Sequence, residues 1–131
     1  MAQELLVTQQ LTEEMRKAGE NLVRLLDKHR FAIRAAFWFY LADQAEWRLY
    51  LAMPEARAIG PKKLYKKLQS VLARETDVPP LSMLVVVDTK DPLVQLLGVA
   101  LKVDGVGGVR FSRNTINGRF IEDAYIYRLA A

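Results

Sequence analysis

A single stretch, residues 31–53, constrains the fold more than any other part of the chain, because it concentrates the aromatic side chains. Its sequence, FAIRAAFWFYLADQAEWRLYLAM, holds both tryptophans, three of the five phenylalanines and two of the five tyrosines. Two alternating runs around a short polar segment predict a β-hairpin, since aromatic residues favour the pleated, half-buried surface of strands. We expect the rest of the chain to cover this hairpin.

The hydrophobic pattern also predicts how the two strands of the hairpin pair. A three-residue loop at 43–45 places Phe39 opposite Leu49 and gathers the apolar positions on one face. A two-residue loop instead places Phe39 opposite Arg48 and mixes apolar and polar positions on both faces. Burial of one face therefore favours the odd-numbered loop, with a positive φ expected at one of its first two residues.

This register predicts a basic and aromatic second face on the hairpin, made of Arg34, Trp38, Tyr40, Arg48 and Tyr50. Helices that cover the face would pack the arginine stems along the rings. An open face would instead offer the rings to a protein partner or to stacking nucleobases. Coverage is favoured, because large exposed aromatic patches are uncommon on soluble proteins. The set is kept as a candidate interaction face.

The composition is that of an ordinary globular protein. With 131 residues, 51% hydrophobic and 26% charged, the chain is expected to form one α+β domain over 1–131. The absence of cysteine excludes a disulfide framework, a zinc–thiolate site and a thiol nucleophile, and no cofactor is indicated. The first ten residues, MAQELLVTQQ, lack the features of a signal peptide, and no apolar run is long enough to span a membrane. We therefore expect a cytoplasmic protein.

Local signals place the remaining elements. Thr12 is positioned to cap a helix that ends near His29, and Gly60-Pro61 to begin a second helix. The stretch 82–88 is apolar on both faces, which is typical of an interior strand with parallel neighbours. Asp91-Pro92 starts a short helix that extends to Val103, and Asn117-Gly118 marks the turn of a final hairpin over 109–129.

The resulting order is α-ββ-α-β-α-ββ. It predicts an α+β fold in which three helices pack on a mixed sheet of about five strands. We expect the two hairpins to form the two halves of this sheet, with the 82–88 strand between them.

The charge of the chain permits contact with nucleic acid or another anionic surface, since 19 basic and 15 acidic residues give a net charge of +4. Four lysines lie on the outer side of the second helix, and arginines lie in the last hairpin: Lys62, Lys63, Lys66, Lys67, Arg110 and Arg113. These side chains are the candidate phosphate contacts, and a solvated helix face is the alternative explanation for the lysines.

Asp88, Thr89 and Lys90 follow the predicted 82–88 strand, at the end where open α/β sheets place functional residues. The acid-x-Lys spacing resembles the end of a restriction-type nuclease motif, in which carboxylates hold a metal and lysine supports the attacking water. Such a site needs a second carboxylate, for which Glu46 or Asp43 would serve if the strands are adjacent. The alternative role of Asp88 is to cap and turn the chain before a helix. The single histidine, His29, is assigned a structural role, and no metal site is indicated.

Three functions follow from these patterns. The first is a small non-enzymatic interaction or assembly module that forms a homo-oligomer, with any further protein partner unidentified, because both faces of the strands are apolar and few helices are available to cover them. The alternative is a nucleic-acid-associated protein that uses the basic helix and the arginine-bearing hairpins. The second alternative is a metal-dependent hydrolase at Asp88 and Lys90. The sequence leaves open whether the chain is an enzyme.

Overall fold

The computed structural model describes residues 10–130. These residues form a five-stranded sheet with helices on both of its faces. The elements are, in order, α2 Glu13–Lys28, β1 Ala35–Leu41, β2 Glu46–Ala52, α3 Glu55–Ala58, α4 Pro61–Leu72, the 3-10 turn η1 Leu81–Met83, β3 Leu84–Val87, α5 Pro92–Ala100, β4 Val109–Ile116 and β5 Arg119–Leu129. The predicted α+β class and the order α-ββ-α-β-α-ββ are confirmed. The one-turn helix α3 is an addition to the three predicted helices.

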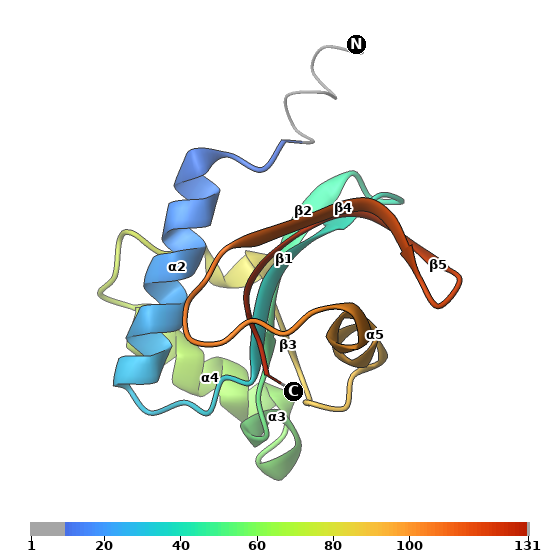
Figure 1. Ribbon diagram of the computed structural model, residues 1–131. Helices are drawn as coiled ribbons and strands as arrows, with labels where there is room; N and C mark the ends of the chain where they lie inside the picture. Colours follow the sequence, from blue (N-terminus) through green and yellow to red (C-terminus); the bar gives the residue numbers. More distant parts are fainter. Residues whose placement is uncertain (1–9, 131) are drawn as a thin grey trace.

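The strands are arranged in the order β3-β2-β1-β5-β4. All neighbouring pairs are antiparallel except β2 and β3, so the sheet is mixed. The helices α2 and α4 lie on one side of the sheet, and α5 lies on the other, inside the curve of the β4–β5 hairpin (Figure 1). The β1–β2 hairpin is therefore covered on both faces, and β1 is the central strand.

The predicted register of the first hairpin is wrong. The structure pairs Phe39 with Arg48 and Tyr40 with Trp47, across a four-residue loop in which Ala45 has the positive φ. The prediction assumed that only one face is buried, whereas here each face has its own apolar cluster. When both faces are covered, apolar side chains are buried on either face. Gathering them on one face therefore no longer favours the odd-numbered loop.

The predicted place of the third strand is also wrong, although its parallel pairing is confirmed. β3 is an edge strand beside β2, and β5 lies directly against β1. The Tyr65 hydroxyl of α4 donates to Leu84 O at 3.1 Å and accepts from Val86 N at 3.1 Å. The Tyr65 hydroxyl thus pairs with two backbone groups on the edge of β3 that faces away from β2. Because α4 covers this edge, the side chains of β3 can be as apolar as those of an interior strand.

Three local signals are confirmed. Thr12 caps α2 by accepting from Met15 N at 3.1 Å, and Asp91 caps α5 by accepting from Leu93 N at 3.0 Å. Asn117 and Gly118 both have positive φ and join β4 to β5 in a two-residue turn, as such turns require.

A buried polar contact joins α2 to the sheet. Trp38 Nε1 donates to the Tyr127 hydroxyl at 3.0 Å, and that hydroxyl donates to the Arg16 carbonyl oxygen of α2. Both rings are almost fully buried, and burial raises the pKa of the Tyr127 phenol well above its usual value. Gly19 makes this approach possible, since a Cβ there would overlap the Tyr127 hydroxyl and Trp38 Nε1.

A register shift between β1 and β5 falls at Tyr127 and Arg128. Arg128 lies beside α2, where its guanidinium donates to both carboxylate oxygens of Asp27 at 2.9 and 2.7 Å. The hydrogen bond to Asp27 raises the pKa of the Arg128 guanidinium. The bulge thus directs two successive side chains of β5 toward the same helix.

Residues 1–9, for which the sequence predicts no signal peptide, lie outside the described part of the chain. Within residues 10–130, no helix combines the length and apolarity needed to cross a membrane.

Candidate functional site

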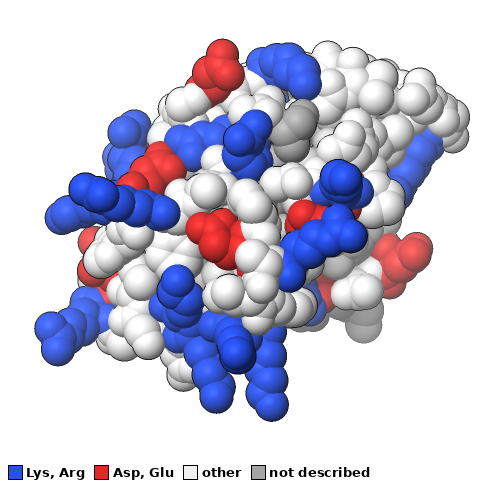
Figure 2. Space-filling view, turned by 90° about the horizontal axis from the view of Figure 1, so that it is seen from below, with Lys and Arg blue, Asp and Glu red and all other residues white. Residues whose placement is uncertain are grey.

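One end of the sheet carries a strong excess of positive charge. The segments 27–34 and 55–67, here called the basic end, contain eight lysines and arginines against two carboxylates, a net charge of +6 within a chain whose total is +4. The eight cationic residues are all exposed: Lys28, Arg30, Arg34, Arg57, Lys62, Lys63, Lys66 and Lys67. Figure 2 looks at the molecule from below the view of Figure 1 and shows Lys and Arg gathered on this side, with Asp and Glu interspersed among them.

Contacts join the two segments of the basic end. Ala32 N donates to Glu55 Oε2 at 3.1 Å, which ties the entry to β1 to the start of α3. The Lys67 ammonium of α4 lies 5.8 Å from the centre of the Phe31 ring. The predicted lysine face is therefore part of a larger surface, to which the residues after α2 also contribute.

The lysines of α4 are placed unfavourably for the stability of that helix. Lys62 and Lys63 lie in its first turn, which has no acidic residue and where the helix dipole disfavours cations. The spacing also sets Lys62 against Lys66 and Lys63 against Lys67, and like charges four residues apart destabilise a helix. Helix stability alone does not account for this arrangement.

Arg30 has an unfavourable backbone. It follows α2 with a φ of 64°, and its N–H donates to Asp27 O at 3.0 Å while Phe31 N–H donates to Leu26 O at 3.0 Å. This is the Schellman arrangement that glycine usually supplies, because an L side chain is strained in the left-handed region. A long cationic side chain thus occupies a position where glycine would be more stable.

The two predicted tail arginines do not join this surface. β4 is the edge strand opposite β3, whereas α4 packs near β3. Arg110 is held by Asp123, with both guanidinium–carboxylate contacts at 2.6 Å, and its guanidinium lies 5.8 Å from the centre of the Trp47 ring. Arg113 is exposed in β4 with a positive φ. The six candidate phosphate contacts therefore divide into one cluster of four lysines and two separate arginines.

The observed register divides the candidate interaction face. Trp38 and Tyr40 lie on the side of α2 and are buried, whereas Tyr50 and Arg48 lie on the side of α5. Arg48 pairs with Glu46 on that side at 2.8 Å. Arg34 precedes β1 and belongs to the basic end, so these five residues do not form one surface.

Asp88 and Lys90 follow the end of β3, as expected. The carboxylates expected beside them, Asp43 and Glu46, lie elsewhere. β2 and β3 are parallel and adjacent, yet Asp43 and Glu46 precede or begin β2, at the opposite end from Asp88. Asp88 instead accepts from Thr89 N at 2.7 Å and faces Arg57 at 3.6 Å. Across residues 10–130 no three His, Asp or Glu side chains gather in a way that would hold a metal ion.

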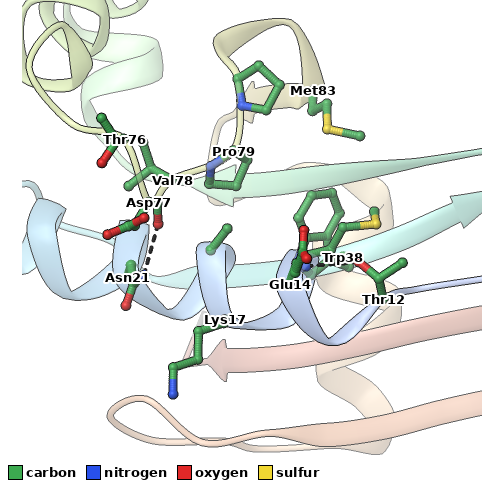
Figure 3. A pocket seen from close by; sticks show the side chains of 13 residues that line it. Thr12, Glu14, Lys17, Asn21, Trp38, Thr76, Asp77, Val78, Pro79 and Met83 are labelled. Atoms are coloured by element: carbon green, nitrogen blue, oxygen red, sulfur yellow. Dashed lines mark hydrogen bonds between the residues drawn. The ribbon is translucent and has the colours of Figure 1, made fainter.

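A cavity of about 550 Å³ lies between α2 and the segment 76–83 (Figure 3). Trp38 forms its floor, and Asn21 spans one side by donating to the Asp77 carbonyl oxygen at 2.9 Å. Its rim mixes Glu14 and Asp77 with Lys17, so the charge favours neither an anionic nor a cationic ligand.

Another cavity, of about 330 Å³, lies at the basic end and extends to the next turn of α4. Seven residues line it: His29, Arg30, Phe31, Glu55, Lys67, Ser70 and Val71. Sequence reasoning missed this cavity, because its residues come from three separate elements. The sequence offered one sign of the site, which is that Arg30, and not glycine, follows the predicted end of the first helix at His29.

Comparison with protein families, curated proteins and solved structures finds no match to this chain.

Proposed function

We propose that the protein is a non-enzymatic module that binds nucleic acid through the basic end. The observation that carries this proposal is the concentration of eight exposed cations on two joined segments, against a net charge of −2 over the rest of the chain. A surface of this kind attracts a polyanion and releases its counterions on contact.

The placement of these cations supports the proposal. Lys62, Lys63 and Arg30 lie where the helix dipole or the backbone conformation disfavours them. Backbone strain of the kind seen at Arg30 clusters at functional sites, where it can be part of the mechanism. A basic face that only served solubility would not need cations at these particular positions.

The test is fluorescence anisotropy with labelled single- and double-stranded oligonucleotides, over a series of salt concentrations. We expect binding that weakens steeply with salt, and a loss of at least about 100-fold when Lys62, Lys63, Lys66 and Lys67 all become Glu. The matched control replaces four exposed cations elsewhere, Lys17, Arg24, Arg113 and Arg119, by Glu.

The control carries the same change in net charge and should retain most of the affinity. Equal losses in the two variants would show that only overall charge matters and would remove the assigned surface. Absence of binding at low salt would refute the proposed function.

A second candidate is assembly into a homo-oligomer, and a difference between the two sheet edges favours it. Tyr65 satisfies outward groups of β3, whereas no strand of the described chain pairs with the outer edge of β4. Antiparallel pairing of Val109–Ser112 with a second copy would set Arg110 opposite Phe111, so like charges would not face each other. Light scattering behind size-exclusion chromatography tests this, and a strict monomer at high micromolar concentration would exclude it.

A further inference from the structure

The cavity within the basic end combines three kinds of group. It has an aromatic ring, Phe31, two cations, Arg30 and Lys67, and a carboxylate, Glu55. Its volume of about 330 Å³ lies at the lower end of the roughly 300–1,000 Å³ typical of small-ligand sites. The question is which ligand would use all of these groups together.

The Phe31 ring offers a stacking surface. It is half-buried, and the Lys67 ammonium now lies over it at 5.8 Å from the ring centre. Stacking of a nucleobase on an aromatic ring is generally stronger than a cation–π contact at an exposed site. A base can therefore replace the ammonium on the ring, and the flexible Lys67 side chain can turn to a phosphate.

Glu55 offers a hydrogen-bond acceptor without a partner. Its Oε2 accepts from Ala32 N at 3.1 Å, whereas its Oε1 is shielded from solvent and has no hydrogen-bond partner. A buried acceptor left unpaired is unfavourable, so a ligand that reaches Oε1, once the side chains that shield it have moved aside, gains affinity by donating to it. Carboxylates accept from the amino group of cytosine, whereas thymine and uracil have no amino group and present carbonyl oxygens.

A role in ligand binding would explain why Arg30, rather than glycine, has the left-handed backbone conformation here. Its left-handed conformation follows the last turn of α2 and brings a cation to the wall of the cavity. A guanidinium there serves the phosphate that follows a bound base, since arginine binds phosphate in a fixed, bidentate geometry.

We propose, building on the nucleic-acid function above, that this cavity binds one unpaired base of a single strand, stacked on Phe31 and read by Glu55. The site takes a base with an amino group, cytosine in preference to thymine or uracil. Arg30 and Lys67 hold the adjacent phosphates, and the lysines Lys62, Lys63 and Lys66 carry the strand beyond the cavity.

The experiment measures the affinity of labelled (dC)8, (dT)8 and an eight-base-pair duplex by anisotropy at fixed salt. We expect (dC)8 to bind at least about 5-fold more tightly than (dT)8. Phe31→Leu keeps an apolar side chain toward the core and should weaken (dC)8 by about 5- to 100-fold while leaving the duplex unchanged. Glu55→Gln keeps an acceptor for Ala32 N and should bring the ratio of the two single-strand affinities close to one.

The outcomes separate this proposal from the one on which it rests. Binding that depends on the α4 lysines but not on Phe31 or Glu55 would overturn the base site and leave the nucleic-acid function standing. Equal losses for duplex and single strand in Phe31→Leu would do the same. If none of the three probes binds at low salt, both the base site and the nucleic-acid function are overturned. Thermal unfolding of each variant verifies that it is folded when its affinity is measured.

Discussion

The two amphipathic helices on the same side of the sheet, α2 and α4, place their charges in opposite ways. α2 has Glu13 and Glu14 in its first turn and Lys28 in its last, and it carries the pairs Glu13–Arg16 and Glu20–Arg24. These positions all agree with the helix dipole or with favourable spacing. The charges of α2 are explained by the stability of the helix itself.

α4 follows none of these rules in its polar positions. Its first turn holds two lysines, its lysines face each other four residues apart, and its last turn has no basic residue. The buried side of α4 packs on the sheet as that of α2 does. Leu64 and Leu68 are fully buried in the same cluster as Leu22 and Leu26. The difference between the helices is confined to the exposed side, as the proposed binding role of α4 requires.

The largest expected effect concerns the buried side of α2. By helix propensity alone, Gly19→Ala would stabilise α2 by about 1 kcal/mol. We predict the opposite sign, a loss of about 2–4 kcal/mol, because the new Cβ would overlap the buried Tyr127 hydroxyl and Trp38 Nε1. Urea unfolding measures the change. Lys17→Ala, an exposed site in the same helix, should stay within about 0.5 kcal/mol of the parent protein.

A charge reversal in the first turn of α2 should have the next largest effect. Replacing Glu13 and Glu14 by Lys makes α2 resemble α4 and should lower the free energy of unfolding by about 1–2 kcal/mol at low salt. Nucleic-acid affinity should not fall, because this turn lies outside the basic end. A variant as stable as the parent would contradict the electrostatic explanation of α2.

A smaller effect is expected at Arg30. Arg30→Gly relieves the left-handed backbone and should stabilise the protein by about 0.5–1 kcal/mol, as measured by thermal unfolding. The same change removes a cation from the cavity and should weaken single-strand binding. A variant that gains stability with no loss of binding would show that Arg30 has no part in the site.

The contrast between the helices also shows how far the sequence alone leads. Caps and turns were predictable because each depends on a few adjacent residues, as at Thr12, Asp91 and Asn117-Gly118. The hairpin register was not, because it depends on whether one face or both faces are covered, and distant helices decide that. Leu84–Val87 was misplaced for a similar reason, since the Tyr65 hydroxyl that satisfies its edge lies on another element.

The candidate site was predictable only in part. The exposed lysines of α4 follow directly from the spacing of apolar positions in that helix. The cavity does not, because the contact between Ala32 and Glu55 and that between Phe31 and Lys67 join segments more than 20 residues apart. The face assigned to Arg34, Trp38, Tyr40, Arg48 and Tyr50 was lost together with the register on which it depended.

The most direct test of the central claim measures stability and affinity on one variant, Lys62→Glu with Lys63→Glu. The new carboxylates suit the first turn of α4 and stand four residues before Lys66 and Lys67, so the free energy of unfolding should rise by about 1 kcal/mol. Affinity for an oligonucleotide should fall at least about 10-fold in the same preparation. A variant that is more stable and binds less would show that these lysines serve binding rather than folding. Unchanged affinity in a stabilised variant would contradict the account.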